Sequence, residues 1–380
     1  MALSRILLVD DAATWRRLHP LTCLSPIADV RIGILTIGEK WAERTGASID
    51  VRSDASLHLA AVSDDDVDRV VASDVLPDDG LVRAIAELGP DDRLVDADGR
   101  WVAGRGDREH TVEGAVRRID RPWDVFRLND AELRRDFELV TAGRHSAPLS
   151  DTNTLIGPRD NLFIERGAWV EASTLNVEDA PIYIGRGAKI LEGCSVRLGL
   201  ALCEHAVLKM GARIYGATTV GPHCKVGGEV SNSVLFGYSN KGHDGYLGNA
   251  VIGRWCNLGA DTTNSNLKNN YGMVTAWSMA DEAFIETGLQ FLGLIMGDHA
   301  KSGINTMFNT ATVVGPFANI FGAEFPPKYV PPFRWGRDGV FRLDKAFEMA
   351  ERMMARRGLE LTERERDTIT ALHRAHNTQT

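Results

Sequence analysis

The architecture of the chain follows from residues 184–226, which read IGRGAKILEGCSVRLGLALCEHAVLKMGARIYGATTVGPHCKV. Every sixth position of this stretch is aliphatic, in the order Ile184, Ile190, Val196, Leu202, Leu208, Ile214, Val220 and Val226. A period of six differs from the 3.6-residue turn of a helix and from the two-residue alternation of an ordinary strand, and it indicates a parallel β-helix built from hexapeptide repeats. Three hexapeptide faces would make one triangular coil, with the aliphatic side chains inside.

A second register of small residues has the same period. Its members lie four residues after the aliphatic positions: Ala188, Cys194, Leu200, Ala206, Ala212, Thr218 and Cys224. Two of the cysteines therefore have a packing role, since small side chains fit where the chain turns a corner beside the next coil. The five cysteines form no CxxC pair and are odd in number, which is typical of free thiols in a reducing cytoplasm.

The phase of six extends beyond this stretch and is broken twice. We expect a left-handed β-helix over residues 149–325, with later repeats at Ile252, Leu258 and Val314. The phase fails over 227–245 (GGEVSNSVLFGYSNKGHDG) and over 260–277 (ADTTNSNLKNNYGMVTAW). Segments that loop out of a solenoid often collect on one face as a binding surface. Both segments are therefore expected to leave the coils and to carry functional residues.

The two flanking regions have other patterns. Residues 1–148 predict an α/β domain, with strands at 5–10, 49–53 and 57–62 and helices at 32–46 and 80–88. Residues 326–380 predict an extended strap rich in proline and aromatic residues, followed by two helices. The first helix covers about 343–357, and Thr362 with Glu365 forms a capping-box pattern at the start of the second.

Composition limits the class of protein. The chain has 380 residues, 44% of them hydrophobic, and a formal net charge of -9. These values fit a compact protein with two domains and argue against a general nucleic-acid binder, although a local basic pocket for a phosphate is compatible with an acidic whole. The N-terminus lacks the apolar core of a signal peptide, and no run is long enough to span a membrane. We therefore expect a cytoplasmic protein with no membrane partner.

Two motifs in the broken region resemble a known family. The segments GHDGYLGNAVIG (242–253) and CNLGADTTNSNL (256–267) resemble the acetyltransferase half of the bifunctional N-acetylglucosamine-1-phosphate uridylyltransferase/glucosamine-1-phosphate N-acetyltransferase family, in its shortened sugar nucleotidyltransferase-like branch. The resemblance covers most of residues 150–335. It implies an enzyme of UDP-N-acetylglucosamine biosynthesis that moves an acetyl group from acetyl-CoA to an amino-sugar phosphate. It also implies a homotrimer that binds acetyl-CoA between neighbouring subunits.

The resemblance assigns roles to individual residues. His243 matches the general base, and a histidine suits this role because its pKa lies near neutrality. The other matches are Tyr246 and Asn257 near the sugar, Asn266 near the reacting acyl group, and Ala260, whose backbone lies near the acyl donor. Lys268 could attract a phosphate, although a solvated loop lysine and turn-capping asparagines are the alternative interpretation. One departure is that Ser231 and Asn232 stand where the family has a phosphate-clamping lysine.

The N-terminal half departs further from the family pattern. The segment RRLHPLTCLSPIADVRIG (16–33) resembles the part of a nucleotidyltransferase that follows a glycine-rich phosphate loop, but the preceding LVDDAATW has no glycine. A phosphate cradle needs unobstructed backbone N–H groups. Either Asp10 or Asp11 holds Mg²⁺ while Arg16 or Arg17 meets the nucleotide phosphate, or the carboxylates cap the strand end and turnover is lost.

Two rival functions remain open. The first is a noncatalytic sensor, in which a degenerate nucleotide-sugar domain is attached to a trimerising solenoid. The second is a zinc hydratase of the gamma carbonic anhydrase type, because His205 and His223 lie one coil apart and His243 could be a third ligand.

Overall fold

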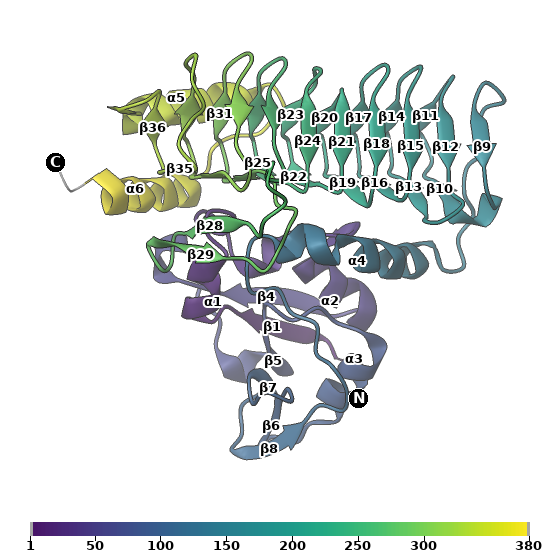
Figure 1. Cartoon of the computed structure of the whole chain (residues 1–380). Helices are drawn as coiled ribbons and strands as arrows, with labels where there is room; N and C mark the ends of the chain where they lie inside the picture. Colours follow the sequence, from purple (N-terminus) through teal and green to yellow (C-terminus); the bar gives the residue numbers. More distant parts are fainter. Residues whose placement is uncertain (1–2, 378–380) are drawn as a thin grey trace.

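The computed structural model describes residues 3–377 as an α/β domain, a long β-helix and two C-terminal helices. Figure 1 shows the β-helix as a row of coils, with the N-terminal domain below it and the C-terminal helices at the end of the row. The predicted fold class is thus confirmed. Among the described residues, no helix is both long and apolar enough to cross a membrane.

The N-terminal domain contains a six-stranded mixed sheet with the order β4-β1-β5-β7-β6-β8. Its strands are β1 (Arg5–Val9), β4 (Ser48–Arg52), β5 (Arg69–Ala72), β6 (Asp92–Val95), β7 (Trp101–Gly104) and β8 (Arg108–Thr111). Strand β1 is parallel to both β4 and β5. The carboxyl ends of these three strands therefore meet at one edge of the sheet, directly after Val9, Arg52 and Ala72.

Four α-helices accompany this sheet: α1 (Ala12–Arg17), α2 (Ile37–Thr45), α3 (Asp79–Glu87) and α4 (Asp124–Thr141). The helix predicted over 32–46 begins only at Ile37, because Thr36 and Glu39 form a capping box and 31–36 forms the hairpin β2 (Arg31–Ile32) and β3 (Leu35–Thr36). The strand predicted over 57–62 is wrong. Leu57 ends the short 3-10 helix η2 (Ala55–Leu57), and the residues after it pair with no strand.

The β-helix has three faces of parallel strands, named here in chain order. The first face contains β10 (Leu162–Ile164), β13 (Ile182–Ile184), β16 (Leu200–Leu202), β19 (Thr218–Val220), β22 (Val234–Gly237), β25 (Val251–Arg254), β30 (Ile295–Met296), β33 (Val313–Val314) and β35 (Tyr329–Val330). The second contains β11 (Trp169–Val170), β14 (Lys189–Ile190), β17 (Val207–Leu208), β20 (Lys225–Val226), β23 (Asn240–Lys241), β26 (Asn257–Leu258), β31 (Lys301–Ser302), β34 (Asn319–Ile320), β36 (Arg334–Trp335) and the antiparallel β37 (Gly339–Val340). The third contains β9 (Thr154–Ile156), β12 (Thr174–Asn176), β15 (Ser195–Arg197), β18 (Arg213–Tyr215), β21 (Glu229–Ser231) and β24 (Tyr246–Gly248), and continues as the pair β27 (Thr263–Asn264) and β32 (Met307–Phe308).

The eight aliphatic positions of the repeat all lie in the interior of the β-helix, as predicted. Successive coils align Ile184 with Leu202 and Leu202 with Val220, eighteen residues apart each time. The next coil is shorter, since Val220 aligns with Leu235 after fifteen residues. The expectation that 227–245 loops out is therefore wrong. The segment forms β21, β22 and β23 in the stack. The six-residue phase shifts because this coil has fifteen residues where the coils before it have eighteen.

The second broken segment does leave the stack. Leu258 aligns with Ser302, forty-four residues further on, so this coil contains a long excursion. Its central part is the antiparallel hairpin β28 (Thr275–Ser278) and β29 (Ala283–Glu286). Figure 1 shows this hairpin reaching down to the N-terminal domain. Val274, Ala276 and Leu292 are buried in the same hydrophobic core as the strands and helices of that domain.

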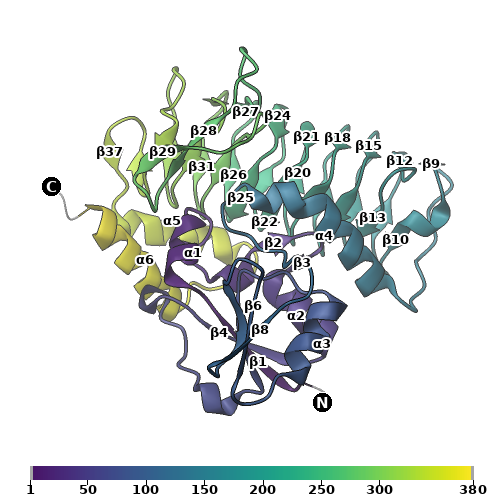
Figure 2. The same ribbon diagram turned by 60° about the horizontal axis from the view of Figure 1, so that its bottom comes forward.

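Helix α4 joins the two domains along the coils, as Figure 2 shows from a second side. Asn129 on α4 accepts a hydrogen bond from the Gly33 N–H at 2.7 Å and donates one to the Ala217 carbonyl at 2.9 Å. Thr219 donates to the Gly33 carbonyl at 2.8 Å. Since all these groups are buried, each hydrogen bond replaces one that water would otherwise make, and the domains are docked in one orientation.

One corner of the β-helix is a ladder of stacked rings. It consists of His205, His223, Tyr238, Trp255, His299, Phe317 and Phe333, with ring centroids 4.2–6.2 Å apart. All seven have a positive φ, which is the turn conformation at this corner. The C-terminal helices α5 (Leu343–Ala355) and α6 (Glu363–Asn377) pack over the Phe333 end of the ladder. The capping box predicted for the second helix is present, with Thr362 and Glu365 bonded reciprocally.

Candidate functional site

His243 lies on the turn between β23 and β24, at the corner where the second face meets the third. Its side chain is exposed, and the imidazole makes no hydrogen bond to the described residues. The neighbouring turns leave no room for side chains at two glycines. A Cβ on Gly228 would approach the His243 carbonyl at 2.9 Å, and one on Gly245 would approach the Thr262 carbonyl at 2.2 Å. The backbone that presents His243 is therefore tightly packed while its ring faces solvent.

A buried lysine holds this turn from inside the coil. Lys241 occupies an inward position that aligns with Val226 of the coil before it. Its ammonium donates to the carbonyls of His243 at 2.7 Å, Asp244 at 3.2 Å and Gly227 at 3.1 Å. Burial lowers the pKa of Lys241 to about 8. Sequence reasoning missed this residue, because position 241 faces inward only through the shortened coil.

Tyr246 and Asn266 are brought together on the third face. The Asn266 amide donates to the Tyr246 hydroxyl at 3.0 Å and to the Asn249 side-chain oxygen at 2.7 Å. Burial raises the pKa of Tyr246, so the phenol stays protonated near neutrality. Both side chains are half-buried and polar. The pair forms a polar edge on the third face, and Tyr246 is three residues along the chain from His243.

The other residues implied by the resemblance lie elsewhere in the same coils. Asn257 is on the second face, where it accepts a hydrogen bond from Asn240 at 2.9 Å. Ala260 is at the next turn after His243 along the stack, and its carbonyl accepts from the Asn305 N–H at 2.8 Å. Lys268 donates to the Met273 carbonyl at 2.9 Å, within its own excursion. Of these three residues, Lys268 is therefore the one already held by its loop.

A cation that sequence reasoning did not select lies on the third face. Arg213 aligns with Glu229, and Glu229 aligns with Tyr246. The Arg213 guanidinium is half-exposed and lies 3.9 Å from the Glu229 carboxylate. The position of Arg213 in the repeat, one coil before the segment with Ser231 and Asn232, would have identified it as a candidate phosphate contact.

In the N-terminal domain, Asp10 follows β1 and is half-buried. One oxygen accepts from the Ile27 N–H at 3.1 Å and from the Ser53 hydroxyl. The other oxygen is buried and has no hydrogen-bond partner among the described residues. Burial raises the pKa of Asp10 to about 6. The unpaired buried oxygen is the feature of this edge that is compatible with a Mg²⁺ ligand.

Of the other three residues of the predicted nucleotide site, Asp11 and Arg17 bond to neighbouring side chains or backbone, and Arg16 is exposed. Asp11 is the N-cap of α1 and accepts from the Thr14 N–H at 2.8 Å. Arg17 pairs with Asp120 at 2.7 Å. Arg16 is exposed at the end of α1. The structure therefore leaves both interpretations of this edge available, with Asp11 favouring the capping role.

Asp74 was missed, although it follows β5 in the segment VVASD much as Asp10 follows β1. Because β1 and β5 are parallel neighbours, Asp74 lies at the same sheet edge as Asp10. Arg118 meets both of its oxygens at 2.9 Å, and Arg100 lies 3.2 Å away. This carboxylate is thus charge-balanced by two arginines in the structure.

The predicted zinc ligands have a different arrangement. His205 and His223 stack as expected at 5.1 Å, but Tyr238 then stacks on His223 at 4.9 Å as part of the aromatic ladder. Over residues 3–377, no three or more histidine, cysteine, aspartate or glutamate side chains are grouped so that they could hold a metal ion. The two histidines have a packing explanation in the ladder.

The chain is similar to a family model over its N-terminal part and to relatives of low identity over longer stretches. Residues 6–145 match the family model described as Sugar nucleotidyl transferase. The chain is 22% identical over 262 residues to the bifunctional protein GlmU of Synechococcus elongatus, covering 66% of this chain and 51% of the relative. It is 26% identical over 216 residues to GlmU of Geotalea uraniireducens, covering 51% and 46%. The chain thus spans about half the length of the curated relatives it matches.

Solved structures with partial overlap include acyltransferases. One is the polysialic acid O-acetyltransferase OatWY, with 13% identity, a TM-score of 0.22 and coverage of 48% of this chain and 82% of that one. Another is the Arabidopsis UDP-N-acetylglucosamine acyltransferase, with 13% identity, a TM-score of 0.19 and coverage of 61% and 93%.

Proposed function

We propose that the β-helix of this chain, which is similar in sequence to the GlmU proteins, is an N-acetyltransferase that uses acetyl-CoA, with His243 as the general base. The observation that carries the proposal is the arrangement around residue 243. A solvent-facing imidazole stands on a turn held by Lys241, beside the hydrogen-bonded pair Tyr246 and Asn266. The acceptor we propose is an amino-sugar phosphate of UDP-N-acetylglucosamine biosynthesis.

The chemistry needs few groups. The amine nitrogen attacks the thioester carbonyl, His243 takes the proton from that nitrogen, and the thiolate leaves with the electron pair of the broken C–S bond and is then protonated. The negative charge that develops on the carbonyl oxygen needs a hydrogen-bond donor, for which the Asn266 amide or a backbone N–H is suitable. Tyr246 would contact the sugar from the polar edge of the third face.

The remaining assignments complete this proposal. Asn257 would contact the sugar, the backbone at Ala260 would lie along the acetyl-CoA, and a homotrimer would place a neighbouring subunit over that site. For the sugar phosphate we prefer Arg213 to Lys268, since the Lys268 ammonium is bonded to its own loop. Arg213 is half-exposed and shares the third face with Tyr246.

For the N-terminal domain we propose nucleotide-sugar binding at the edge that carries Asp10. If Mg²⁺ is bound there, the unpaired oxygen of Asp10 and the carboxylate of Asp11 would hold it, and the ion would supply positive charge to the nucleotide phosphates. Sensing without turnover is the second candidate. It is favoured by the capping role of Asp11 and the ion pair of Arg17.

The direct test is thiol release from acetyl-CoA in the presence of glucosamine 1-phosphate. We expect turnover by the wild type and a loss of about 10²- to 10⁴-fold in His243→Ala, the range of a general base. His145→Ala is the matched control, because His145 is also an exposed histidine but lies in the segment between the domains. Equal rates for the wild type and His243→Ala would exclude the proposed base.

The nucleotide proposal has a separate test. UTP and UDP-N-acetylglucosamine would each be titrated into the full chain with and without Mg²⁺, and binding would be measured by calorimetry. Binding that needs Mg²⁺ and is weakened in Asp10→Asn supports the metal-dependent site. Binding of the nucleotide sugar that is indifferent to Mg²⁺ and accompanied by no pyrophosphate exchange supports the sensor.

A further inference from the structure

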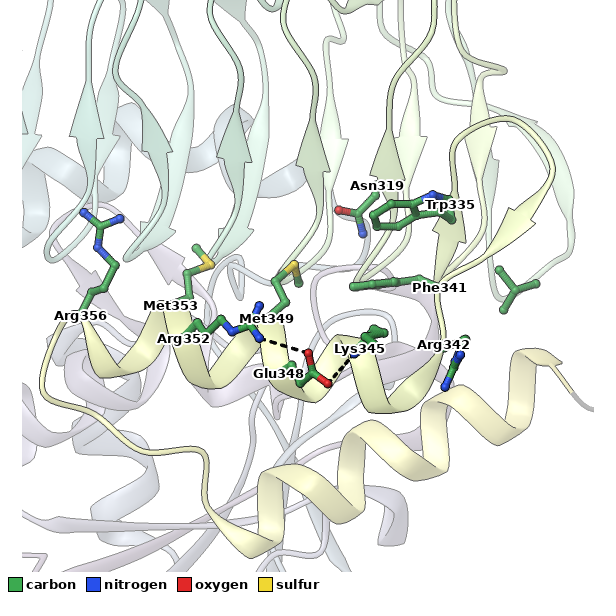
Figure 3. Close-up of a pocket in the computed structure, with 11 residues that line it drawn as sticks. Asn319, Trp335, Phe341, Arg342, Lys345, Glu348, Met349, Arg352, Met353 and Arg356 are labelled. Atoms are coloured by element: carbon green, nitrogen blue, oxygen red, sulfur yellow. Dashed lines mark hydrogen bonds and ion pairs between the residues drawn. The ribbon is translucent and has the colours of Figure 1, made fainter.

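A groove separates helix α5 from the second face of the β-helix near its C-terminal end. Figure 3 shows Met349 and Met353 pointing from α5 toward the strands, with Trp335 and Phe341 at one end of the groove and Arg356 at the other. Its volume is about 630 Å³. Met349 and Met353 are half-buried, and Trp335 is 45% exposed. The wall is therefore apolar and accessible, and flexible methionine side chains adapt to ligands of varied shape.

The groove is basic although the chain as a whole carries a net charge of -9. Four cations line it, Arg342, Lys345, Arg352 and Arg356, of which Arg342 is paired with Asp344 at 2.7 Å. The carboxylate in the lining is Glu348, which binds Lys345 at 2.6 Å and Arg352 at 3.3 Å. Within the part of the chain that the structure describes, Arg356 has no carboxylate partner. Positive charge is thus in excess at the Arg356 end.

Further cations lie at that end, since the Arg357 guanidinium donates to the His223 carbonyl at 3.4 Å and Lys225 follows His223 by two residues. The pKa of Lys225 is lowered by burial and then by the positive charges of Arg357, Lys209 and Arg356. Over residues 3–377, none of these four side chains forms an ion pair. Cations that are close together without a counter-ion repel one another, so an anion bound among them would be stabilised. We call Lys209, Lys225, Arg356 and Arg357 the cation cluster.

We propose that this groove binds an anionic amphiphile, with an aliphatic chain along Met349 and Met353 and a phosphate or carboxylate group at the cation cluster. The dimensions agree with this ligand. At about 1.5 Å per helical residue, α5 rises roughly 16 Å between Lys345 and Arg356, comparable with an extended dodecyl chain. The site is distinct from the turn of His243, and the inference does not depend on the acetyl-transfer proposal.

The test is calorimetric titration of the full chain with dodecyl phosphate below its micelle concentration. We expect saturable binding, weakened at least tenfold in Arg356→Glu and again in Met353→Glu. Two variants serve as matched controls with unchanged affinity. Arg337→Glu replaces an 80% exposed arginine at the end of the β-helix, and Met273→Glu replaces a 62% exposed methionine in the excursion.

Parallel titrations identify the source of the anion. Dodecanoate and dodecanoyl-CoA test a fatty acid and an acyl thioester, and binding of either one with the same dependence on Arg356 supports the shared chemistry. Equal affinity for the neutral dodecyl maltoside, or no effect of Arg356→Glu, would overturn the proposal. So would a change of molecular mass by light scattering in Met353→Glu, because the groove would then be a contact between subunits.

Discussion

At the scale of single residues, stability depends strongly on a buried charge cluster that joins α2 to α4. Lys40 lies 3.0 Å from Glu132 and 2.5 Å from Asp136, and all three side chains are at most 2% exposed. Lys40→Ala would leave the buried Asp136 carboxylate without its cation, while Glu132 would keep its ion pair with Arg117 at 3.2 Å. We expect a loss of roughly 3–5 kcal/mol in the free energy of unfolding, measured by denaturant titration.

A surface pair provides the comparison for Lys40. Lys345 and Glu348 are bonded at 2.6 Å but are 51% and 39% exposed. Because solvent screens such a pair, Lys345→Ala should lower the free energy of unfolding by at most about 1 kcal/mol. Equal losses in the two variants would show that burial does not set the strength of the Lys40 cluster.

Asp298 gives a residue-scale prediction about pH. Burial raises the pKa of Asp298 from 3.8 to about 6 in the folded chain. The folded state therefore binds the carboxyl proton of Asp298 more tightly than the unfolded state does. The contribution of this proton to the free energy of unfolding is fully present below about pH 4 and is lost as the pH rises through about 6. Between pH 4 and 7 the free energy of unfolding of the wild type should fall by on the order of 3 kcal/mol more than that of Asp298→Asn. Parallel unfolding titrations check this, and identical pH slopes would contradict it.

At the scale of elements, the hairpin β28–β29 connects the β-helix to the N-terminal domain. Ala276 is fully buried against that domain, and Arg121 bonds Asp281 at 3.1 Å. Ala276→Asp would put an unpaired carboxylate into the interface and favour undocking of the domains. We expect trypsin to cleave faster near Arg144, between α4 and the first coil, with Tyr271→Asp as an exposed control. An unchanged cleavage rate would mean that the hairpin is not needed to keep the domains docked.

The same hairpin shows how far sequence reasoning reaches at the element scale. Both breaks in the period of six were visible, but a phase slip looks the same whether residues are lost or gained within a coil. The pairing of Val220 with Leu235 shows a shortened coil, and the pairing of Leu258 with Ser302 shows an insertion. Only the strands on either side of each break distinguish the two cases, because they define which residues align.

At the scale of the whole molecule, exposed apolar side chains favour the proposed homotrimer. Ile304 is 71% exposed and Phe321 50% exposed, and the two lie in neighbouring coils. Exposed apolar patches often mark protein contacts. We expect light scattering to give about 125 kDa, three chains of 41.6 kDa, and a smaller mass for Ile304→Glu but not for Leu359→Glu. A wild-type mass of one chain would contradict the trimer.

The candidate site was only partly readable from the sequence. The order of motifs selected His243, Tyr246 and Asn266, and the structure brings Tyr246 and Asn266 into contact. Lys241 was missed because the expected loop placed it in solvent, whereas the shortened coil turns it inward. Asp74 was missed because β1 and β5 are far apart in the chain and become neighbours only in the sheet.

Local patterns in the sequence were enough to predict the β-helix, its aliphatic interior and the α/β character of the N-terminal domain. These properties depend on local periodicity, which a single coil or strand already contains. The folded chain was needed to show which break is an excursion, how the domains dock and where the basic groove lies. Those features depend on contacts between residues far apart in the chain, such as Asn129 with Ala217. No local pattern specifies them, because their energy arises only when separate elements meet.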